Sequence, residues 1–397
     1  MSNMQKHMLK SRLPPLPPKL ESNLRKGVTA RQKDYNPNQW DQYFEEKKDI
    51  ETSRGTFRVY LSKQPQQPGP VVVCLHGGGY SALSWAHFNI EITEMVHCSC
   101  LSIDLRGHGD THTNDDDDLS AETMASDVVT VLQTMYGEEM PNIIMIGHSM
   151  GGAICVHVAE MEQLHTLVGV VVIDVVEGTA MEALASMQSF LRSRPSHFKS
   201  IQHAIEWSIR SGQIRNVQSA KVSMPGQIVN VETGKLATNE LPLDDSRQAS
   251  LDIPDEKQTF TSPMAIPEDA EFVPETSETN TPHTFTASVL DDPKKYKWRI
   301  DLSKSEKYWP GWFEGLSNKF LNLRAAKLLL LAGIDNLDKT LTVGQMQGKF
   351  QMQVLARCGH AVHEDLPHDV AEVVGSFMLR NRFATESGDF VRRMPAC

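Results

Sequence analysis

The sequence predicts a doubly wound α/β fold, for two reasons. Short runs rich in Val, Ile and Leu alternate with helical patterns, and a chain of 397 residues, 40% of them hydrophobic, can bury a large core. Continuous apolar runs bounded by Gly, Asp or Pro are typical of parallel strands that are buried on both faces. The expected strands are residues 71–75, 100–103, 143–146, 168–173, 328–331 and 352–355, and one of the expected helices is residues 120–135.

Net charge and cysteine usage narrow the class of protein. The 39 Lys and Arg against 50 Asp and Glu give a net charge of −11, which excludes a general nucleic-acid binder because such a protein needs a basic face. The six cysteines are scattered without metal-binding spacing, which favours a reducing compartment. No run reaches the roughly 20 apolar residues of a membrane helix, and no secretory leader pattern is present. We expect a soluble monomer of the cytoplasm or the nucleus that does not bind membranes.

Composition divides the chain into five parts. Residues 1–33 contain eight basic residues, one acidic residue and four prolines, and we expect them to form a flexible basic tail. Folded structure is expected over residues 34–224, which include the start of a helical cap, and again over residues 294–385. Residues 386–397 are expected to form a short C-terminal tail.

The remaining part, residues 225–293, is expected to be a disordered acidic insertion. It contains 14 acidic residues, three basic residues and eight prolines, so its charge of −11 equals that of the whole chain. A segment with this composition cannot bury enough apolar surface to offset the entropy lost on ordering.

The strand 143–146 leads directly into the sequence GHSMG (147–151), and a helix is expected over residues 152–161. A serine between two glycines at a strand-to-helix turn is typical of a nucleophile elbow, in which a strained backbone projects the hydroxyl outward. The start of the helix also favours negative charge that develops beside the serine. Ser149 is therefore the candidate nucleophile.

A second glycine-rich sequence, HGGG (76–79), follows the strand 71–75. Acyl transfer at a serine needs two N–H donors for the oxyanion, one from the residue after the nucleophile and one from an earlier loop. The backbone N–H groups of Met150 and of Gly78 or Gly79 are the candidates for this oxyanion hole.

A serine hydroxyl needs a histidine base, and that histidine needs a carboxylate to orient it. His360 follows the last expected strand and is the candidate base, whereas His363 and His368 are expected to be structural. The pattern does not decide which aspartate is the acid. Asp174 follows the expected strand 168–173, and Asp335 and Asp338 follow the expected strand 328–331.

Other clusters of polar residues are expected to be structural. The run DLRGHGD (104–110) is interpreted as a turn that shapes a loop, and the four aspartates 115–118 lack the spacing of a calcium loop. The pair His360 and His363 has no further ligand set to support a metal. We therefore expect no metal and no organic cofactor.

Several long sequences together resemble the protein phosphatase methylesterases. The resemblance extends from about Trp40 to Phe383, outside the expected insertion, and these sequences are longer and more specific than a general esterase signature. They are HGGGYSALSW (76–85), DLRGHGDT (104–111), DLSAETMASDV (118–128), IGHSMGGAI (146–154), IDVVEGTAM (173–181), RSGQIRN (210–216), EKYWPGWFEGLSN (306–318), LTVGQMQGKFQMQVL (341–355) and CGHAVHED (358–365).

The resemblance implies an α/β-hydrolase with a helical cap that removes the methyl ester from the C-terminal leucine of the protein phosphatase 2A catalytic subunit. It implies a triad of Ser149, Asp174 and His360, with the acid assigned to Asp174 by the resemblance and not by spacing. The partner would be the C-terminal tail of that subunit and its holoenzyme.

Two segments can wall the groove that a protein tail needs, residues 181–222 and the aromatic run 308–313. Tyr80, Trp309 and Trp312 are the candidate substrate contacts, although packing within a cap explains the tryptophans equally well. Two other functions fit the sequence, a carboxylesterase of broad specificity and a protein that sequesters the phosphatase with little catalysis.

Overall fold

The computed structural model describes residues 34–242, 294–333, 338–388 and 390. The expected basic tail, residues 243–293 of the expected insertion, Asp335 and residues 391–397 lie outside the described residues. All of the described helices and strands belong to the compact unit that begins at Tyr35.

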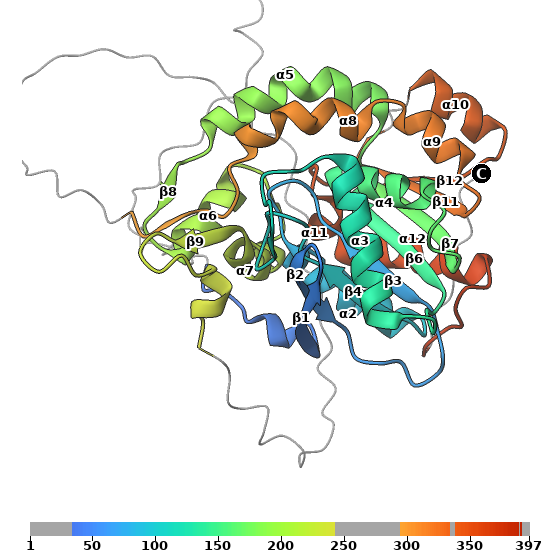
Figure 1. Cartoon of the computed structure of the whole chain (residues 1–397), viewed down its shortest axis with the longest axis horizontal. Coiled ribbons are helices and arrows are strands. Elements are labelled where there is room, and N and C mark those ends of the chain that lie inside the picture. Colours follow the sequence, from blue (N-terminus) through green and yellow to red (C-terminus); the bar gives the residue numbers. More distant parts are fainter. Residues whose placement is uncertain (1–33, 243–293, 334–337, 389, 391–397) are drawn as a thin grey trace, which may run out of the picture. The chain divides into compact units, whose positions relative to one another are not determined.

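A nine-stranded sheet lies at the centre of this unit (Figure 1). Its strands follow the order β1-β2-β4-β3-β6-β7-β11-β12, and β5 pairs with β2. Pairing is antiparallel among β1, β2, β4 and β5 and parallel from β4 through β12. The strands are β1 (Glu46–Thr52), β2 (Gly55–Leu61), β3 (Val71–Leu75), β4 (Ser99–Ile103), β5 (His112–Thr113), β6 (Ile143–His148), β7 (Leu167–Ile173), β11 (Ala326–Leu331) and β12 (Gln351–Val354).

All six strands expected from apolar runs are confirmed, with ends that differ by at most two residues. The hairpin of β1 and β2 was not expected. β1 has the sequence EKKDIET and is largely exposed at the edge of the sheet, so it offers no apolar run to recognise. The expected helix 120–135 is α3, which spans Ala121–Tyr136.

Helices cover both faces of the sheet, which confirms the doubly wound class. Side chains alternate along β3, so that Val71, Val73 and Leu75 join one apolar cluster and Val72 and Cys74 join the other. The first cluster is covered by α3, α4 (Met150–Glu160) and α9 (Leu316–Asn322), and the second by α2 (Ala86–Met95) and α12 (Pro367–Arg380).

A cap is inserted between β7 and β11. Figure 1 shows its helices α5 and α8 alongside each other above the central sheet. A small sheet in the order β8-β10-β9 completes the cap. The cap elements are α5 (Glu177–Ser193), β8 (His197–Phe198), α6 (Ile201–Arg210), α7 (Val217–Ser223), β9 (Ile228–Asn230), β10 (Tyr296–Trp298) and α8 (Trp309–Phe313).

The expectation that disorder begins at residue 225 is wrong for residues 225–242. This stretch forms β9 and a 3₁₀ helix over Ala237–Glu240, and Ile228, Leu236 and Ala237 are buried. Only two of the 14 acidic residues counted for the insertion fall within it. Its apolar residues therefore contribute to the cap core.

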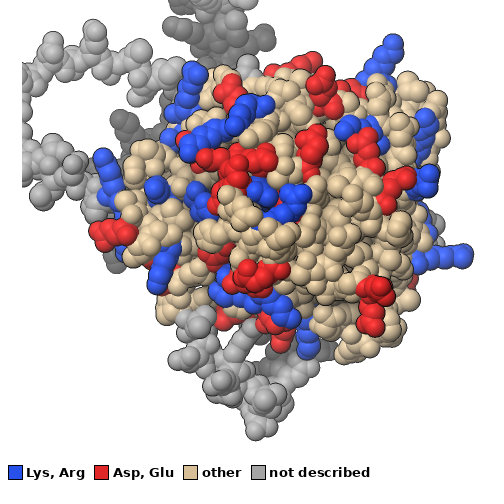
Figure 2. Space-filling model, in the orientation of Figure 1, with Lys and Arg blue, Asp and Glu red and all other residues tan. Residues whose placement is uncertain are grey.

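Two surface properties of the described residues bear on partners. No helix in the described ranges is both long and apolar enough to cross a bilayer. On the face shown in Figure 2, Lys and Arg are interspersed with Asp and Glu and form no continuous basic area.

Candidate active site

The sequence GHSMG (147–151) forms a tight turn between β6 and α4. Ser149 has φ 51° and ψ −120°, a conformation that is strained for a residue with a side chain. Its backbone N–H donates a hydrogen bond of 2.9 Å to the carbonyl oxygen of Ile173 in β7. The turn presents Ser149 at the wall of a cavity.

Two glycines make this turn possible. A Cβ atom at Gly147 would lie 2.2 Å from the carbonyl oxygen of Gly151, and one at Gly151 would lie 2.3 Å from the carbonyl oxygen of Leu75 in β3. Because these separations are far below van der Waals contact, α4 can approach the strands beneath it only where both positions are glycine.

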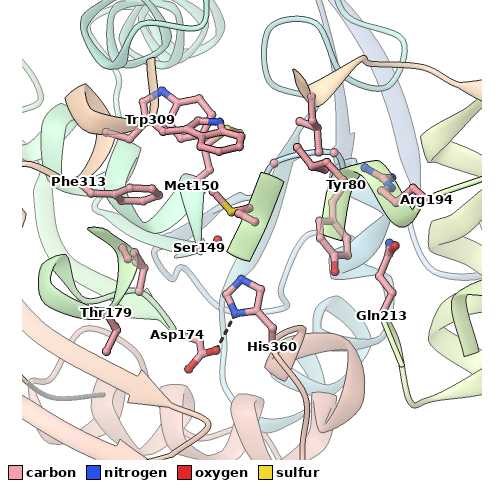
Figure 3. A pocket seen from close by; sticks show the side chains of 18 of the residues that line it. Tyr80, Ser149, Met150, Asp174, Thr179, Arg194, Gln213, Trp309, Phe313 and His360 are labelled. Atoms are coloured by element: carbon pink, nitrogen blue, oxygen red, sulfur yellow. Dashed lines mark hydrogen bonds and ion pairs between the residues drawn. The ribbon is translucent and has the colours of Figure 1, made fainter. Parts of the chain in front are cut away.

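The candidate acid Asp174 follows β7, the neighbour of β6, and hydrogen-bonds to His360 (Figure 3). Its Oδ2 lies 2.7 Å from Nδ1 of His360, and its Oδ1 accepts a hydrogen bond of 2.9 Å from the N–H of Ala332. The Asp174 side chain is 8% exposed, whereas that of His360 is 55% exposed. A buried carboxylate therefore holds a histidine that is open to the cavity.

The electrostatics of this pair favour an ionised carboxylate. Burial by itself raises the pKa of Asp174, but the hydrogen bond and charge of His360 and the N–H of Ala332 outweigh it, so the pKa lies below its ordinary value. An ionised Asp174 accepts a hydrogen bond from the Nδ1–H of His360, which leaves Nε2 to take a proton from a nucleophile.

Ser149 lies on the other side of the His360 ring from Asp174 in Figure 3. Within the described part of the chain, no hydrogen bond joins the Ser149 hydroxyl to that ring. Catalytic hydrogen bonds commonly shorten only when substrate binds. The candidate acid and base are thus already joined, and the candidate nucleophile lies beside them.

A further contact links the serine turn to the loop that carries His360. His148, which precedes Ser149, is buried, and its Nε2 lies 2.8 Å from the carbonyl oxygen of His360. A carbonyl only accepts, so Nε2 carries the hydrogen. Burial lowers the pKa of His148 well below its ordinary value, and the ring is neutral at pH 7. This contact positions the backbone of His360 independently of Asp174.

The two glycines considered for the oxyanion hole differ in their hydrogen bonding. The N–H of Gly79 donates a hydrogen bond of 2.9 Å to Nε2 of His108, whose Nδ1 lies 2.8 Å from the carbonyl oxygen of Arg106. Gly78 is half-exposed at the cavity, close to the side chain of Met150. The N–H of Gly79 is therefore already occupied, which leaves Gly78 as the candidate from this loop.

His108 acts here as a neutral hydrogen-bond acceptor. Burial lowers its pKa to about 4, so Nε2 is unprotonated at neutral pH and can accept the Gly79 N–H. The run 104–110 shapes the loop, as expected, since Oδ1 of Asp104 also accepts a hydrogen bond of 2.7 Å from the N–H of Ala82.

A cavity of about 520 Å³ opens beside Ser149 and His360. The three candidate substrate contacts, Tyr80, Trp309 and Trp312, all line it. Both tryptophans are also buried, with indole N–H groups that donate to Ser305 Oγ and to the carbonyl oxygen of Leu119. They are thus packed in the core and also form the cavity wall. Most of the other lining is apolar, including Val175, Val176, Met187, Leu191, Leu302 and Phe313.

Sequence reasoning missed Arg194 and Gln213, which also line the cavity. Arg194 follows α5 and stacks on Trp298, with its Cζ 3.5 Å from the ring centroid. No local motif marks this arginine, because the ring that it stacks on, Trp298, follows the expected insertion in sequence.

Among the described residues, the alternatives Asp338 and His368 are engaged in other contacts. Asp338 caps α10 (Lys339–Met346), where it accepts a hydrogen bond from the N–H of Leu341 and a second from Ser317 Oγ. His368 pairs with Glu91 at 2.7 Å, and His363 is buried. No group of three or more potential metal ligands occurs among the residues that the structure describes.

A strained serine turn beside a hydrogen-bonded Asp–His pair, carried on a doubly wound sheet, is the arrangement found in α/β-hydrolases. A family model described as "Alpha/beta hydrolase family" matches residues 72–373. Solved structures agree in fold alone, at 15–16% identity. E-2-(acetamidomethylene)succinate hydrolase has a TM-score of 0.57, and the match covers 84% of this chain and 98% of that one. An esterase of M. tuberculosis has a TM-score of 0.53, with coverage of 84% and 91%.

Curated relatives narrow the class further. Protein phosphatase methylesterase 1 of Homo sapiens is 48% identical, over 100% of both chains. The protein of that name from Schizosaccharomyces pombe is 37% identical, over 86% of this chain and 85% of its own. A probable protein phosphatase methylesterase 1 of Caenorhabditis elegans is 40% identical, over 87% of this chain and 78% of its own. The chain belongs to the protein phosphatase methylesterase family, and it is an ester hydrolase.

Proposed function

We propose that this protein removes the methyl ester from the C-terminal leucine of the protein phosphatase 2A catalytic subunit, with Ser149 as nucleophile, His360 as base and Asp174 as the acid that orients it. The hydrogen bond between Asp174 and His360, next to the strained turn of Ser149, carries the proposal of a triad. The substrate is proposed from the 48% identity to the human methylesterase.

Hydrolysis would proceed in two acyl-transfer steps. In the first, Ser149 Oγ attacks the ester carbonyl carbon while Nε2 of His360 takes the hydroxyl proton. The N–H groups of Met150 and Gly78 stabilise the oxyanion. Collapse breaks the bond to the methoxy oxygen, which takes the proton from His360 and leaves as methanol.

In the second step, His360 takes a proton from water, and the resulting nucleophile attacks the acyl-enzyme carbonyl. The bond to Ser149 Oγ breaks, the serine recovers its proton and the free carboxylate is released. No redox partner is required.

The cavity and the cysteines are consistent with this substrate and its compartment. The apolar side chains that line the cavity suit a leucine side chain. The five described cysteines are free, as is usual in the cytoplasm and nucleus. We propose that the enzyme acts there on the phosphatase and its holoenzyme.

The test is incubation of carboxyl-methylated protein phosphatase 2A with the wild-type protein, with Ser149→Ala and with Ser126→Ala, while methanol release is measured. Ser126 is a partly exposed serine of α3 and serves as a matched control. We expect release by the wild type and by Ser126→Ala only. Release by Ser149→Ala would overturn the nucleophile. Cleavage of short esters without release from the phosphatase would overturn the substrate.

A further inference from the structure

Arg194 lies where two cavities meet. The cavity at Ser149, of about 520 Å³, and a second cavity of about 500 Å³ share Leu191, Arg194, Leu302 and Trp309 as lining residues. The second cavity thus continues the first, away from the serine. Figure 3 shows the side chain of Arg194 next to that of Tyr80, at the edge of the cavity that contains Ser149.

The guanidinium of Arg194 is held rigidly but is not neutralised. It stacks on Trp298 at 3.5 Å, and the indole N–H of Trp298 donates a hydrogen bond of 2.8 Å to the carbonyl oxygen of Pro195, which fixes this ring. Among the described residues, no group accepts a hydrogen bond from Arg194, and its Nε is buried without a partner. Burial lowers the pKa of Arg194 to about 10, so the side chain remains charged at neutral pH.

The other poorly exposed arginines that the structure describes all have hydrogen-bond or ion-pair partners. Arg106 forms hydrogen bonds of 2.7 and 2.8 Å to Asp127, Arg58 contacts Asp49 and Asp110, and Arg299 contacts Asp116. Desolvating a guanidinium without a partner costs free energy, so an unpaired one beside an active site is typical of a ligand-binding residue.

The charges around the second cavity also favour an anion. Arg192, His197 and Lys297 line it together with Arg194. Its two acidic residues have hydrogen-bond partners, since Asp301 accepts from the N–H and hydroxyl of Ser303 and Glu306 accepts from Gln188. Among the described residues, Arg194 is the only charged residue shared by the two cavities, and the second cavity holds three Lys or Arg side chains against two carboxylates.

We propose that Arg194 is a specificity residue that binds a carboxylate side chain of the peptide substrate, a few residues before the methyl-esterified terminus. This inference rests on the proposed function, which requires the peptide to extend from Ser149 through the cavities. The two Nη groups of the planar guanidinium have no partner among the described residues, and their donors match a carboxylate in a two-point contact.

The test uses synthetic peptide methyl esters that end in leucine. A single Glu is placed at each of the five positions before the leucine in turn, and each peptide is compared with its Gln counterpart. The variants are Arg194→Gln, Arg194→Lys and the control Arg210→Gln, which changes an exposed arginine paired with Glu206. The measured quantity is the ratio of kcat/KM for the Glu peptide to that for the Gln peptide.

We expect one position to give a ratio of about 10 to 100 in the wild type and in Arg210→Gln. The ratio should fall to about 1 in Arg194→Gln and take an intermediate value in Arg194→Lys. Ratios near 1 at every position in the wild type, with all esters cleaved, would overturn the inference and leave the proposed function standing. A ratio that persists in Arg194→Gln would also overturn it.

Binding separates this inference from catalysis. In the Ser149→Ala background, anisotropy of labelled peptides should show the same preference for Glu and its loss on Arg194→Gln. If the wild type cleaves no peptide ester, the proposed function fails, and the binding ratio still decides the role of Arg194.

Discussion

Oδ2 of Asp174 lies 2.7 Å from Nδ1 of His360, although 186 residues separate the two in sequence. Two structural features create this contact. Asp174 follows β7 in a backbone conformation with positive φ, and the carbonyl oxygen of His360 is bonded to His148 of the serine turn. Carboxylate and imidazole are thus each fixed to the central sheet near Ser149.

The first prediction concerns this carboxylate. Asp174→Asn should reduce kcat by roughly 10⁴-fold, because an amide no longer stabilises the imidazolium or fixes its tautomer. Asp338→Asn is the matched control, since asparagine also caps a helix and Asp338 lies at the start of α10. Steady-state kinetics on a methyl ester distinguish the two. A greater loss for Asp338→Asn would show that the acid was wrongly assigned.

The second prediction concerns the loop that presents Gly78. His108→Ala removes the acceptor for the Gly79 N–H, so we expect kcat to fall about 10- to 100-fold with little change in KM. His108→Gln offers an amide oxygen at a similar place and should restore part of the loss. Equal losses of thermal stability and activity in both variants would indicate that His108 is needed only for folding.

The third prediction concerns the glycines of the serine turn. Gly147→Ala and Gly151→Ala should each yield protein that is unfolded or melts far below the wild type, because the added Cβ would overlap a backbone carbonyl. Gly311→Ala is the control, since nothing lies within 4 Å of its Cβ and alanine favours helix. Circular dichroism melts provide the measurement, and a normal melt for Gly151→Ala would refute the steric account.

The fourth prediction concerns Glu364 in α11 (Val362–Asp365), whose carboxylate is buried without an ion-pair partner among the described residues. Burial raises the pKa of Glu364 from 4.5 to about 8; the Ser223 hydroxyl opposes this shift, and the charge of Asp365 adds to it. Between these values the native state binds more protons than the unfolded state, so this residue makes stability fall as pH rises.

Glu364→Gln should therefore become more stable relative to the wild type as pH increases. The measured quantity is the free energy of unfolding of Glu364→Gln minus that of the wild type, obtained by urea unfolding at pH 5 and at pH 8.5. We expect this difference to be about 1 to 3 kcal/mol larger at pH 8.5. Taking this difference removes the contributions that other titrating groups make to the pH dependence of stability. One such group is His363, because burial lowers its pKa to about 3. A difference that does not vary with pH would show that Glu364 is not a buried titrating group.

Some features could be predicted from sequence because their causes are local. The serine turn depends on two glycines, a preceding apolar strand and a following helix, all within neighbouring residues. The strands of the parallel sheet appear as apolar runs because both of their faces are buried.

Other features depend on tertiary contacts. β7 and β11 are parallel neighbours, with Ile173 opposite Leu330, so the chain leaves both strands at the same edge of the sheet before the candidate acids that follow in sequence. Spacing alone could not choose between them. Arg194 is held in place by Trp298, which is distant in sequence. The charge count over residues 225–293 gave no sign of the apolar residues of 225–242 that pack in the cap.

The strand order of the small sheet has a consequence for folding. Its central strand, β10, comes last in the chain, after both β8 and β9. During synthesis the serine turn and its supporting strands are complete long before Tyr296–Trp298 emerge, so the cap sheet and the Arg194–Trp298 stack can form only late. We therefore expect a nascent or truncated chain to acquire the sheet around Ser149 before it acquires substrate selectivity.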